Sequence, residues 1–105
     1  MEIIETTAFT RRILNLLTDD EYAALQGLLR IQPDLGVLIP GGGGIRKLRW
    51  AATQRGKSGG ARIIYYWVVS QDLIYMLTAY SKNEQTDLSP SQLQFLRRLV
   101  EEEFS

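Results

Sequence analysis

The stretch ARIIYYWVV, residues 61–69, decides the fold of this chain. After its first two residues every side chain is β-branched or aromatic, and these types are enriched in strands. Because the run has no polar alternation, it predicts a central strand that is buried on both faces. It continues through Ser70 and Gln71 into a second apolar run, DLIYMLTAY, residues 72–80. A linkage this short predicts a hairpin.

Another strand is predicted upstream, at IRKLRW, residues 45–50. Side chains alternate between the two faces of a strand, so Lys47 and Arg49 are expected to share one face. Leu48 and Trp50 share the other face. The first face is therefore basic and the second apolar.

The N-terminal third of the chain first alternates and then changes to helical spacing. Glu2–Ala8 is interpreted as a short strand and Phe9–Leu17 as a helix. Thr18 followed by Glu21 is a capping-box pattern, so a second helix is expected to begin there and to end at Pro33. The two helices are expected to form a hairpin.

Two further signals complete the order of elements. Four consecutive glycines, Gly41–Gly44, resist regular structure and predict a flexible turn. Ser89, Pro90 and Gln92 are typical of a helix start, with Ser89 as the N-cap. The order strand, helix, helix, three strands, helix predicts one α+β domain over residues 1–105, with helices packed on a mainly antiparallel sheet.

Positive charge is concentrated in the middle of the chain. The sequence holds 12 Lys and Arg residues against 12 Asp and Glu residues, yet Leu35–Gln71 contains no acid. A surface of one sign attracts phosphates, and aromatic side chains can stack on bases. The segment therefore predicts contact with nucleic acid. Its cations are Arg46, Lys47, Arg49, Arg55, Lys57 and Arg62, and the aromatic residues among them are Trp50, Tyr65, Tyr66 and Trp67.

Two residue types are absent from the sequence, cysteine and histidine. The lack of cysteine excludes disulfides, thiolate metal sites and Cys nucleophiles, and it favours a reducing cytoplasm. The lack of histidine leaves acid–base chemistry to Lys, Arg, Tyr or carboxylates and excludes a His-based metal site. The N-terminal MEIIETTAF lacks the regions of a signal peptide, and no run has the length of a membrane span. We expect a cytoplasmic protein with no membrane partner.

Arg55–Ser58 resembles the end of a P-loop. That phosphate-binding motif needs a glycine where this chain has Ala51, and a helix directly after its last residue. Gly59 and Gly60 lead into a β-run instead, so an NTPase is disfavoured. The segment is better interpreted as a basic loop between strands that contacts phosphates.

Lys47, Arg49 and Arg62 are stronger candidates, because adjacent strands can place them side by side on a rigid sheet. Three cations there suit a phosphate or a phosphorane, whereas the alternative is a solvated strand face with surface ion pairs. Tyr80 and Lys82 stand at the end of the last strand and are expected on one side of it. The alternative for Tyr80 is a half-buried aromatic at the edge of the core.

Three segments together resemble a known family: GGIRKLRW (residues 43–50), RGKSGGARIIYY (55–66) and YSKNE (80–84). They resemble the HigB-like branch of the RelE/ParE toxin superfamily from bacterial toxin–antitoxin modules, over essentially the whole chain. The resemblance implies a microbial-ribonuclease-like fold and an endoribonuclease that cleaves mRNA in the ribosomal A site and inhibits translation. It also implies chemistry without metal or cofactor. The implied partners are the ribosome, mRNA and a cognate antitoxin that often carries a helix-turn-helix DNA-binding domain.

The resemblance also implies roles for single residues by motif position. Arg62 matches a phosphate-stabilising arginine on the central strand, and Lys47 with Arg49 matches the basic pair on the preceding strand. The predicted catalytic residues are Lys47, Arg49, Arg62, Lys82 and Tyr80, and the predicted RNA or ribosome contacts are Arg46, Arg55, Lys57, Tyr65 and Asn83.

The sequence departs from the family pattern after the last strand. Asn83 stands where the best-known members have an arginine, and the tyrosine expected further on falls near Ser89. The role of general acid is therefore open among Tyr80, Tyr65 and Lys57.

Two other functions compete with that of a ribonuclease. A non-catalytic inhibitor of DNA gyrase, as in the ParE branch, would act by protein contact and would not need the clustered cations. A plain RNA-binding module would show affinity for RNA without cleavage.

Overall fold

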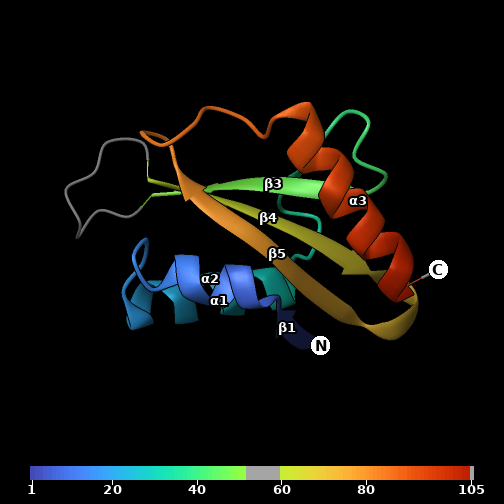
Figure 1. Ribbon diagram of the computed structural model, residues 1–105. Helices are drawn as coiled ribbons and strands as arrows, with labels where there is room; N and C mark the ends of the chain where they lie inside the picture. The colour runs from blue at the N-terminus through green and yellow to red at the C-terminus, as the bar shows by residue number, and fades with distance from the viewer. Residues whose placement is uncertain (52–59, 105) are drawn as a thin grey trace.

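The computed structural model describes residues 1–51 and 60–104, which form a sheet with helices on both faces (Figure 1). No helix in these two segments is long and apolar enough to cross a membrane. The elements are β1 (Glu2–Glu5), α1 (Thr7–Ile13), α2 (Asp19–Ile31), β2 (Val37–Leu38), β3 (Ile45–Trp50), β4 (Ala61–Val68), the 3-10 turn η2 (Val69–Gln71), β5 (Leu73–Ser81) and α3 (Pro90–Phe104).

The sheet has the strand order β1-β5-β4-β3-β2. The strand β1 pairs with β5 in parallel, and the other three pairings are antiparallel. The predicted α+β class, the mainly antiparallel sheet and the central position of β4 are therefore confirmed. The β4–β5 hairpin is confirmed too, and its turn places Asp72 at a φ of 51°.

Helix starts agree with the capping residues of the sequence. The side chain of Thr18 accepts a hydrogen bond from the backbone of Glu21 (3.1 Å), and the carboxylate of Glu21 accepts one from the backbone of Thr18 (2.8 Å). Ser89 and Gln92 form the same reciprocal pair at the start of α3. These local signals were sufficient because each pair satisfies backbone N–H groups that the first turn leaves without partners.

The elements at the N-terminal side differ from the predictions at several points. The strand β1 ends at Glu5 rather than Ala8, because Thr6 caps α1 by accepting a hydrogen bond from the backbone of Phe9 (3.0 Å). The helix α1 ends at Ile13 and not at Leu17. The short strand β2 was not predicted, because two exposed residues show no periodicity.

The two faces of the sheet carry separate cores. The helices α1 and α2 lie on one face and α3 lies on the other (Figure 1). Below α1 and α2 the core contains Phe9, Leu25, Leu29, Leu48, Ile63, Tyr65 and Met76, among others. Below α3 it contains Ile45, Ile64, Leu77, Tyr80, Leu96 and Val100.

The glycine-rich turn before β3 needs glycine at several positions. Gly43 and Gly44 have φ values of 66° and 106°, a region that residues with a Cβ rarely adopt. A Cβ on Gly44 would also lie 2.9 Å from the ring of Tyr66. The predicted turn is thus a tight connection from β2 to β3.

Candidate functional site

A row of polar side chains crosses three strands on the face of the sheet that carries α3. Arg49 on β3 is paired with Arg62 on β4, and Arg62 is paired with Tyr80 on β5. Residues directly opposite each other in antiparallel strands have Cβ atoms about 4.5–5.5 Å apart. We call Arg49, Arg62 and Tyr80 the cross-strand row.

Lys47 lies on the same face as Arg49 and is paired with Ile64, one step closer to α3. Its Nζ donates a hydrogen bond to the carboxylate of Asp87, in the loop between β5 and α3. Lys47 by this hydrogen bond and by its charge, and Arg49 and Arg62 by their charges, lower the pKa of the Asp87 carboxyl below its ordinary value. We call Lys47, Arg49 and Arg62 the cation cluster.

Asp87 is the residue of this site that the sequence did not reveal. It lies outside the acid-free stretch Leu35–Gln71, in a loop that has no periodic pattern. The path of the loop from β5 to α3 brings this carboxylate into contact with Lys47 of the cation cluster. The sole signal in the sequence was an acid close to the Ser89-Pro90 helix start.

Arg62 is buried in the middle of the cross-strand row. Only 7% of its surface is exposed, and charged side chains are seldom this deeply buried unless they are paired. Its neighbours in the strand pairing are Arg49 and Tyr80, so its backbone lies between both adjacent strands. A buried cation on a rigid sheet is a candidate for stabilising an anion.

Tyr80 has both a structural and a chemical aspect. It is 2% exposed and belongs to the core below α3, yet its hydroxyl has no hydrogen-bond partner within the described residues. Burial first, and then the charge of Asp87, raise the pKa of Tyr80 above its ordinary value, against the opposing charge of Arg62. The phenol therefore stays protonated at neutral pH and retains a hydrogen that it can donate.

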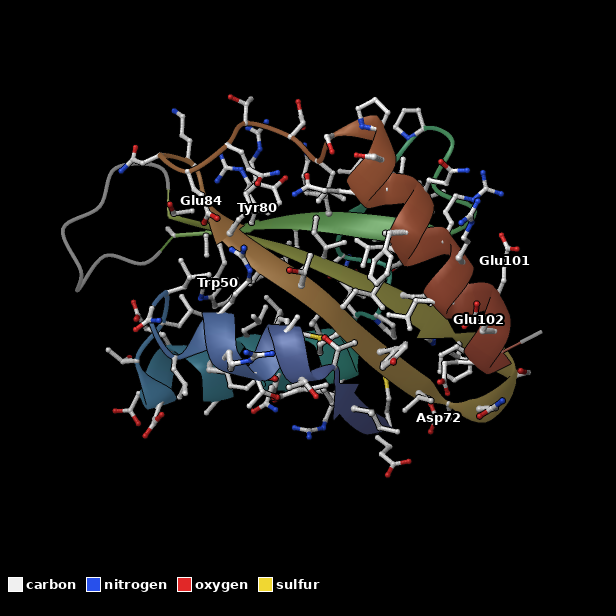
Figure 2. The ribbon with its side chains drawn as sticks, in the orientation of Figure 1. Trp50, Asp72, Tyr80, Glu84, Glu101 and Glu102 are labelled. Carbon is white, nitrogen blue, oxygen red and sulfur yellow. The ribbon has the colours of Figure 1, made fainter. Side chains whose placement is uncertain are left out.

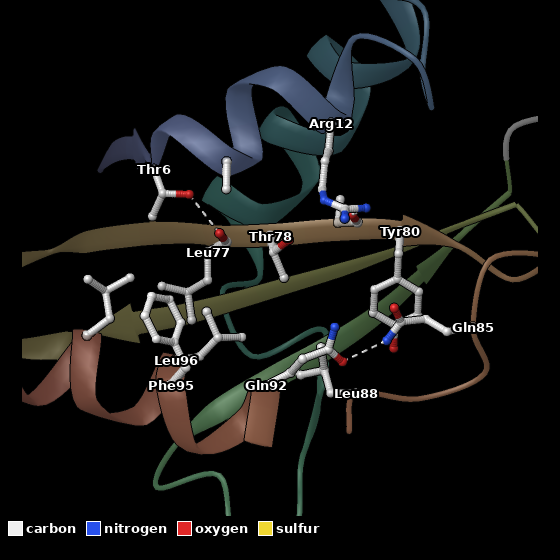
Figure 3. A pocket seen from close by; sticks show the side chains of 13 residues that line it. Thr6, Arg12, Leu77, Thr78, Tyr80, Gln85, Leu88, Gln92, Phe95 and Leu96 are labelled. Atoms are coloured by element: carbon white, nitrogen blue, oxygen red, sulfur yellow. Dashed lines mark hydrogen bonds between the residues drawn. The ribbon is translucent and has the colours of Figure 1, made fainter. Parts of the chain in front are cut away.

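Among the residues that the structure describes, hollows adjoin Tyr80 on two sides. One, of about 320 Å³, lies between α1 and α3, with Tyr80 at one end beside Gln85 (Figure 3). The other, of about 450 Å³, is lined by Lys47, Tyr80 and Asp87 together with apolar side chains from residues 37–40 and 88–93. The second hollow gives a ligand access to Lys47 of the cation cluster and to Tyr80.

Lys82 and Asn83 lie in an exposed turn directly after β5. The backbone N–H of Lys82 donates to the carbonyl of Gly60 (3.3 Å), which fixes the turn at the same end of the sheet as the cross-strand row. Glu84, which follows Asn83, pairs with Arg12 of α1 (2.9 Å), and Figure 2 labels it at the end of β5. Lys82 is thus close to the cross-strand row, but it belongs to the turn and not to β5, which ends at Ser81.

The expected RNA contact of Tyr65 is wrong for this structure. Tyr65 is fully buried on the opposite face, under α1 and α2. Its hydroxyl donates to the carbonyl of Pro33 (2.7 Å) and accepts from the backbone of Gly36 (2.8 Å). A Cβ on Gly36 would lie only 2.8 Å from the Tyr65 ring, so the glycine permits this contact. The ring has no surface left for a base, and Tyr65 is also excluded as the general acid.

The other aromatic residues of the basic stretch do not lie in the row either. Trp50 and Trp67 pack against the core below α1 and α2. Tyr66 packs below α3 and stacks with Phe104, their ring centroids being 6.2 Å apart. The predicted interleaving of cations with base-stacking aromatics is therefore absent from the described part of the site, apart from Tyr80.

Arg46 is also separate from the cation cluster, since it points to the other face of β3. Its Nη1 donates to the carbonyls of Gly36 (2.8 Å) and Asp34 (3.3 Å), so it braces the loop before β2. Two further predicted contacts, Arg55 and Lys57, lie outside the described residues. Of the three candidates for the general acid, Tyr80 alone has a described place at the site.

The comparison with known families agrees with this geometry. A family model described as the RelE toxin of the RelE / RelB toxin-antitoxin system matches residues 6–105. The match extends from the N-cap of α1 to the end of α3 and includes the cation cluster and the cross-strand row. The chain therefore belongs to the RelE toxin family, as the toxin of a toxin–antitoxin system whose partner is an antitoxin.

Proposed function

We propose that this toxin is a metal-independent endoribonuclease that cleaves mRNA in the ribosomal A site and so inhibits translation. The observation that carries the proposal is the position of Arg49, Arg62 and Tyr80 in one row across three strands, with Lys47 beside them. Four groups that bind or protonate oxyanions thus share one rigid surface next to an open hollow. Membership of the RelE family supports the same activity.

Each group has a role in RNA cleavage. The 2′-oxygen attacks the adjacent phosphorus, the 5′-oxygen leaves, and the products are a 2′,3′-cyclic phosphate and a 5′-hydroxyl. Arg49 and Arg62 stabilise the extra negative charge of the phosphorane, which is greatest in the transition state. Tyr80, kept protonated, donates its hydrogen to the phosphorane or to the leaving oxygen. Removal of the 2′-proton falls to Lys47 in the cluster or to Lys82 at the end of β5.

The direct test is to map mRNA 5′ ends after induction of the wild type and of Arg62→Ala. We expect cleavage within A-site codons for the wild type and a loss of about 10²–10³-fold for Arg62→Ala, the range for removal of one preorganised oxyanion donor. Arg98→Ala removes an exposed arginine from α3 and serves as the matched control. Because Arg62 is buried, Arg62→Met, which replaces the apolar stem of the side chain without the guanidinium, is tested beside it.

Cleavage at wild-type level by a folded Arg62→Ala or Arg62→Met protein would contradict the proposal. Growth arrest with intact mRNA would also contradict it, and a supercoiling assay would then test inhibition of DNA gyrase. Binding of RNA without new 5′ ends would indicate a plain RNA-binding module.

A further inference from the structure

The cation cluster is already occupied by an anion that belongs to the chain itself. The carboxylate of Asp87 accepts a hydrogen bond from the Nζ of Lys47 and lies within the electrostatic reach of Arg49 and Arg62. Arg49 and Arg62 are the cations that the proposed reaction needs for the phosphate, and Lys47 lies on the same face beside Arg49. An internal carboxylate therefore lies where the phosphate of RNA is expected to bind.

The loop holds Asp87 in this position through α3. The side-chain amide of Gln85 donates to the backbone carbonyl of Asp87 (2.9 Å) and to the side chain of Gln92 (3.0 Å). Gln92 in turn accepts a hydrogen bond from the backbone of Ser89, the N-cap of α3 (2.8 Å). Asp87 is thus presented by an ordered loop, next to the positive end of a helix.

The contact can nevertheless be broken without unfolding. The side chain of Asp87 is 66% exposed and that of Lys47 is 23% exposed, so water can solvate both groups when they separate. Exposed ion pairs of this kind add little to stability. The hollow of about 450 Å³ beside them is lined by the same two residues. A phosphate that enters this hollow therefore approaches Lys47 next to Asp87.

We propose, resting on the proposed function, that Asp87 is a displaceable internal anion that occupies the phosphate position on the cation cluster of the free toxin. A phosphate and a carboxylate repel each other at contact distance, so RNA binds only after Asp87 has moved away. Free RNA then binds weakly. The mRNA held in the ribosome binds because its effective concentration at the site is high. The contact thereby makes the toxin selective for ribosome-bound RNA.

The test compares two acids of the same loop. Asp87→Asn removes the carboxylate on the cation cluster, and Glu84→Gln removes the one that pairs with Arg12 of α1. The probe is a single-stranded RNA oligonucleotide with 2′-O-methyl groups, which cannot be cleaved by attack of the 2′-oxygen, and its binding to the purified protein is measured by fluorescence anisotropy. We expect Asp87→Asn to bind the probe about tenfold more tightly than the wild type. This is the gain expected if Asp87 blocks the site in about nine-tenths of the wild-type molecules. Glu84→Gln is expected to bind like the wild type.

Asp87→Glu keeps the charge and is expected to bind the probe as weakly as the wild type. Unchanged or weaker binding by Asp87→Asn would overturn the inference. So would a loss of ribosome-dependent cleavage at unchanged RNA affinity, because Asp87 would then be a positioning residue for Lys47. If the wild type cleaves no mRNA but Asp87→Asn binds the probe more tightly, the proposed function fails while the displaceable anion stands.

Discussion

The face of the sheet that carries α3 has two halves with opposite properties. In the covered half Ile45, Ile64 and Leu77 are buried under α3. The half beyond the start of α3, which we call the open half, carries the cation cluster and Tyr80. Arg49 is exposed there, although Arg62 and Tyr80 are themselves buried. On β4 the change takes place between Ile64 and Arg62, two residues apart on one face.

This comparison teaches where a site can form on a continuous sheet. Strand alternation decides which face a side chain occupies, but it does not decide whether that face is core or surface. The covering helix does, and α3 begins at Pro90, close to Lys47 and Tyr80 at the border. The covered half supplies stability, and the open half is free to hold charges that a core would exclude.

The strongest test of this division is Ile64→Ala, in the covered half. Ile64 is fully buried, so we expect the free energy of unfolding to fall by about 2–5 kcal/mol, from lost apolar burial and from the cavity left behind. Urea denaturation measures the change, and Val37→Ala, at an exposed position of β2, is the control. A variant as stable as the wild type would contradict the division.

The converse change is Arg49→Ala, in the open half. Arg49 is exposed, so we expect the free energy of unfolding to change by no more than about 0.5 kcal/mol. The cleavage rate should nevertheless fall about 10²-fold or more, because one donor to the phosphorane is lost. The rate is measured on ribosome-bound mRNA. Full activity together with clear destabilisation would reverse the roles assigned to the two halves.

A pair of tyrosines sharpens the comparison across the two faces. Tyr65→Phe removes the hydroxyl that binds Pro33 and Gly36, so we expect a loss of stability of about 1–3 kcal/mol with cleavage unchanged. Tyr80→Phe removes a hydroxyl without a described partner, so stability should be kept while cleavage falls. Denaturation and cleavage are measured on both variants. If both variants lost the same stability and the same cleavage activity, the two tyrosines would not differ in role.

The smallest expected effect is the pH dependence of the contact between Lys47 and Asp87. Since the folded state lowers the pKa of Asp87, the contact stabilises the protein at pH values above the ordinary pKa of an aspartate. This contribution is lost as the pH falls through the lower, folded pKa. We therefore expect a small excess in the melting temperature of the wild type over Asp87→Asn at neutral pH, and it should vanish in acid. An excess that grows in acid would have the wrong sign.

Local chemistry made much of the fold predictable. The capping pairs Thr18 with Glu21 and Ser89 with Gln92 lie within one turn of chain, so the sequence contains both partners at a fixed spacing. The common face of Lys47 and Arg49 followed from alternation in the same way. Both kinds of signal need only neighbouring residues.

The remaining features depend on contacts between distant segments. In β4 both faces are apolar, so the sequence could not tell that Tyr65 points under α1 and α2 to a loop at Pro33 and Gly36. The place of Asp87 depends on how the loop after β5 returns to α3. Alternation along residues 45–50 places Arg46 and Lys47 on opposite faces of the strand. The prediction of a nucleic-acid surface nevertheless included both, because it counted the charges of the whole stretch without regard to faces.

The parallel pairing of β1 with β5 has a consequence for the order in which the toxin forms. Residues from the start of the chain close the sheet against its last strand, and Thr6 donates to the carbonyl of Leu77, 71 residues later (2.7 Å). Contacts this distant in sequence form late, both in folding and during synthesis. Tyr80 and Asp87 are translated after Leu77, so the proposed site cannot be complete until residues well beyond the first strand have been made. Under the proposed function, this topology delays activity until the first and last strands of the sheet have paired.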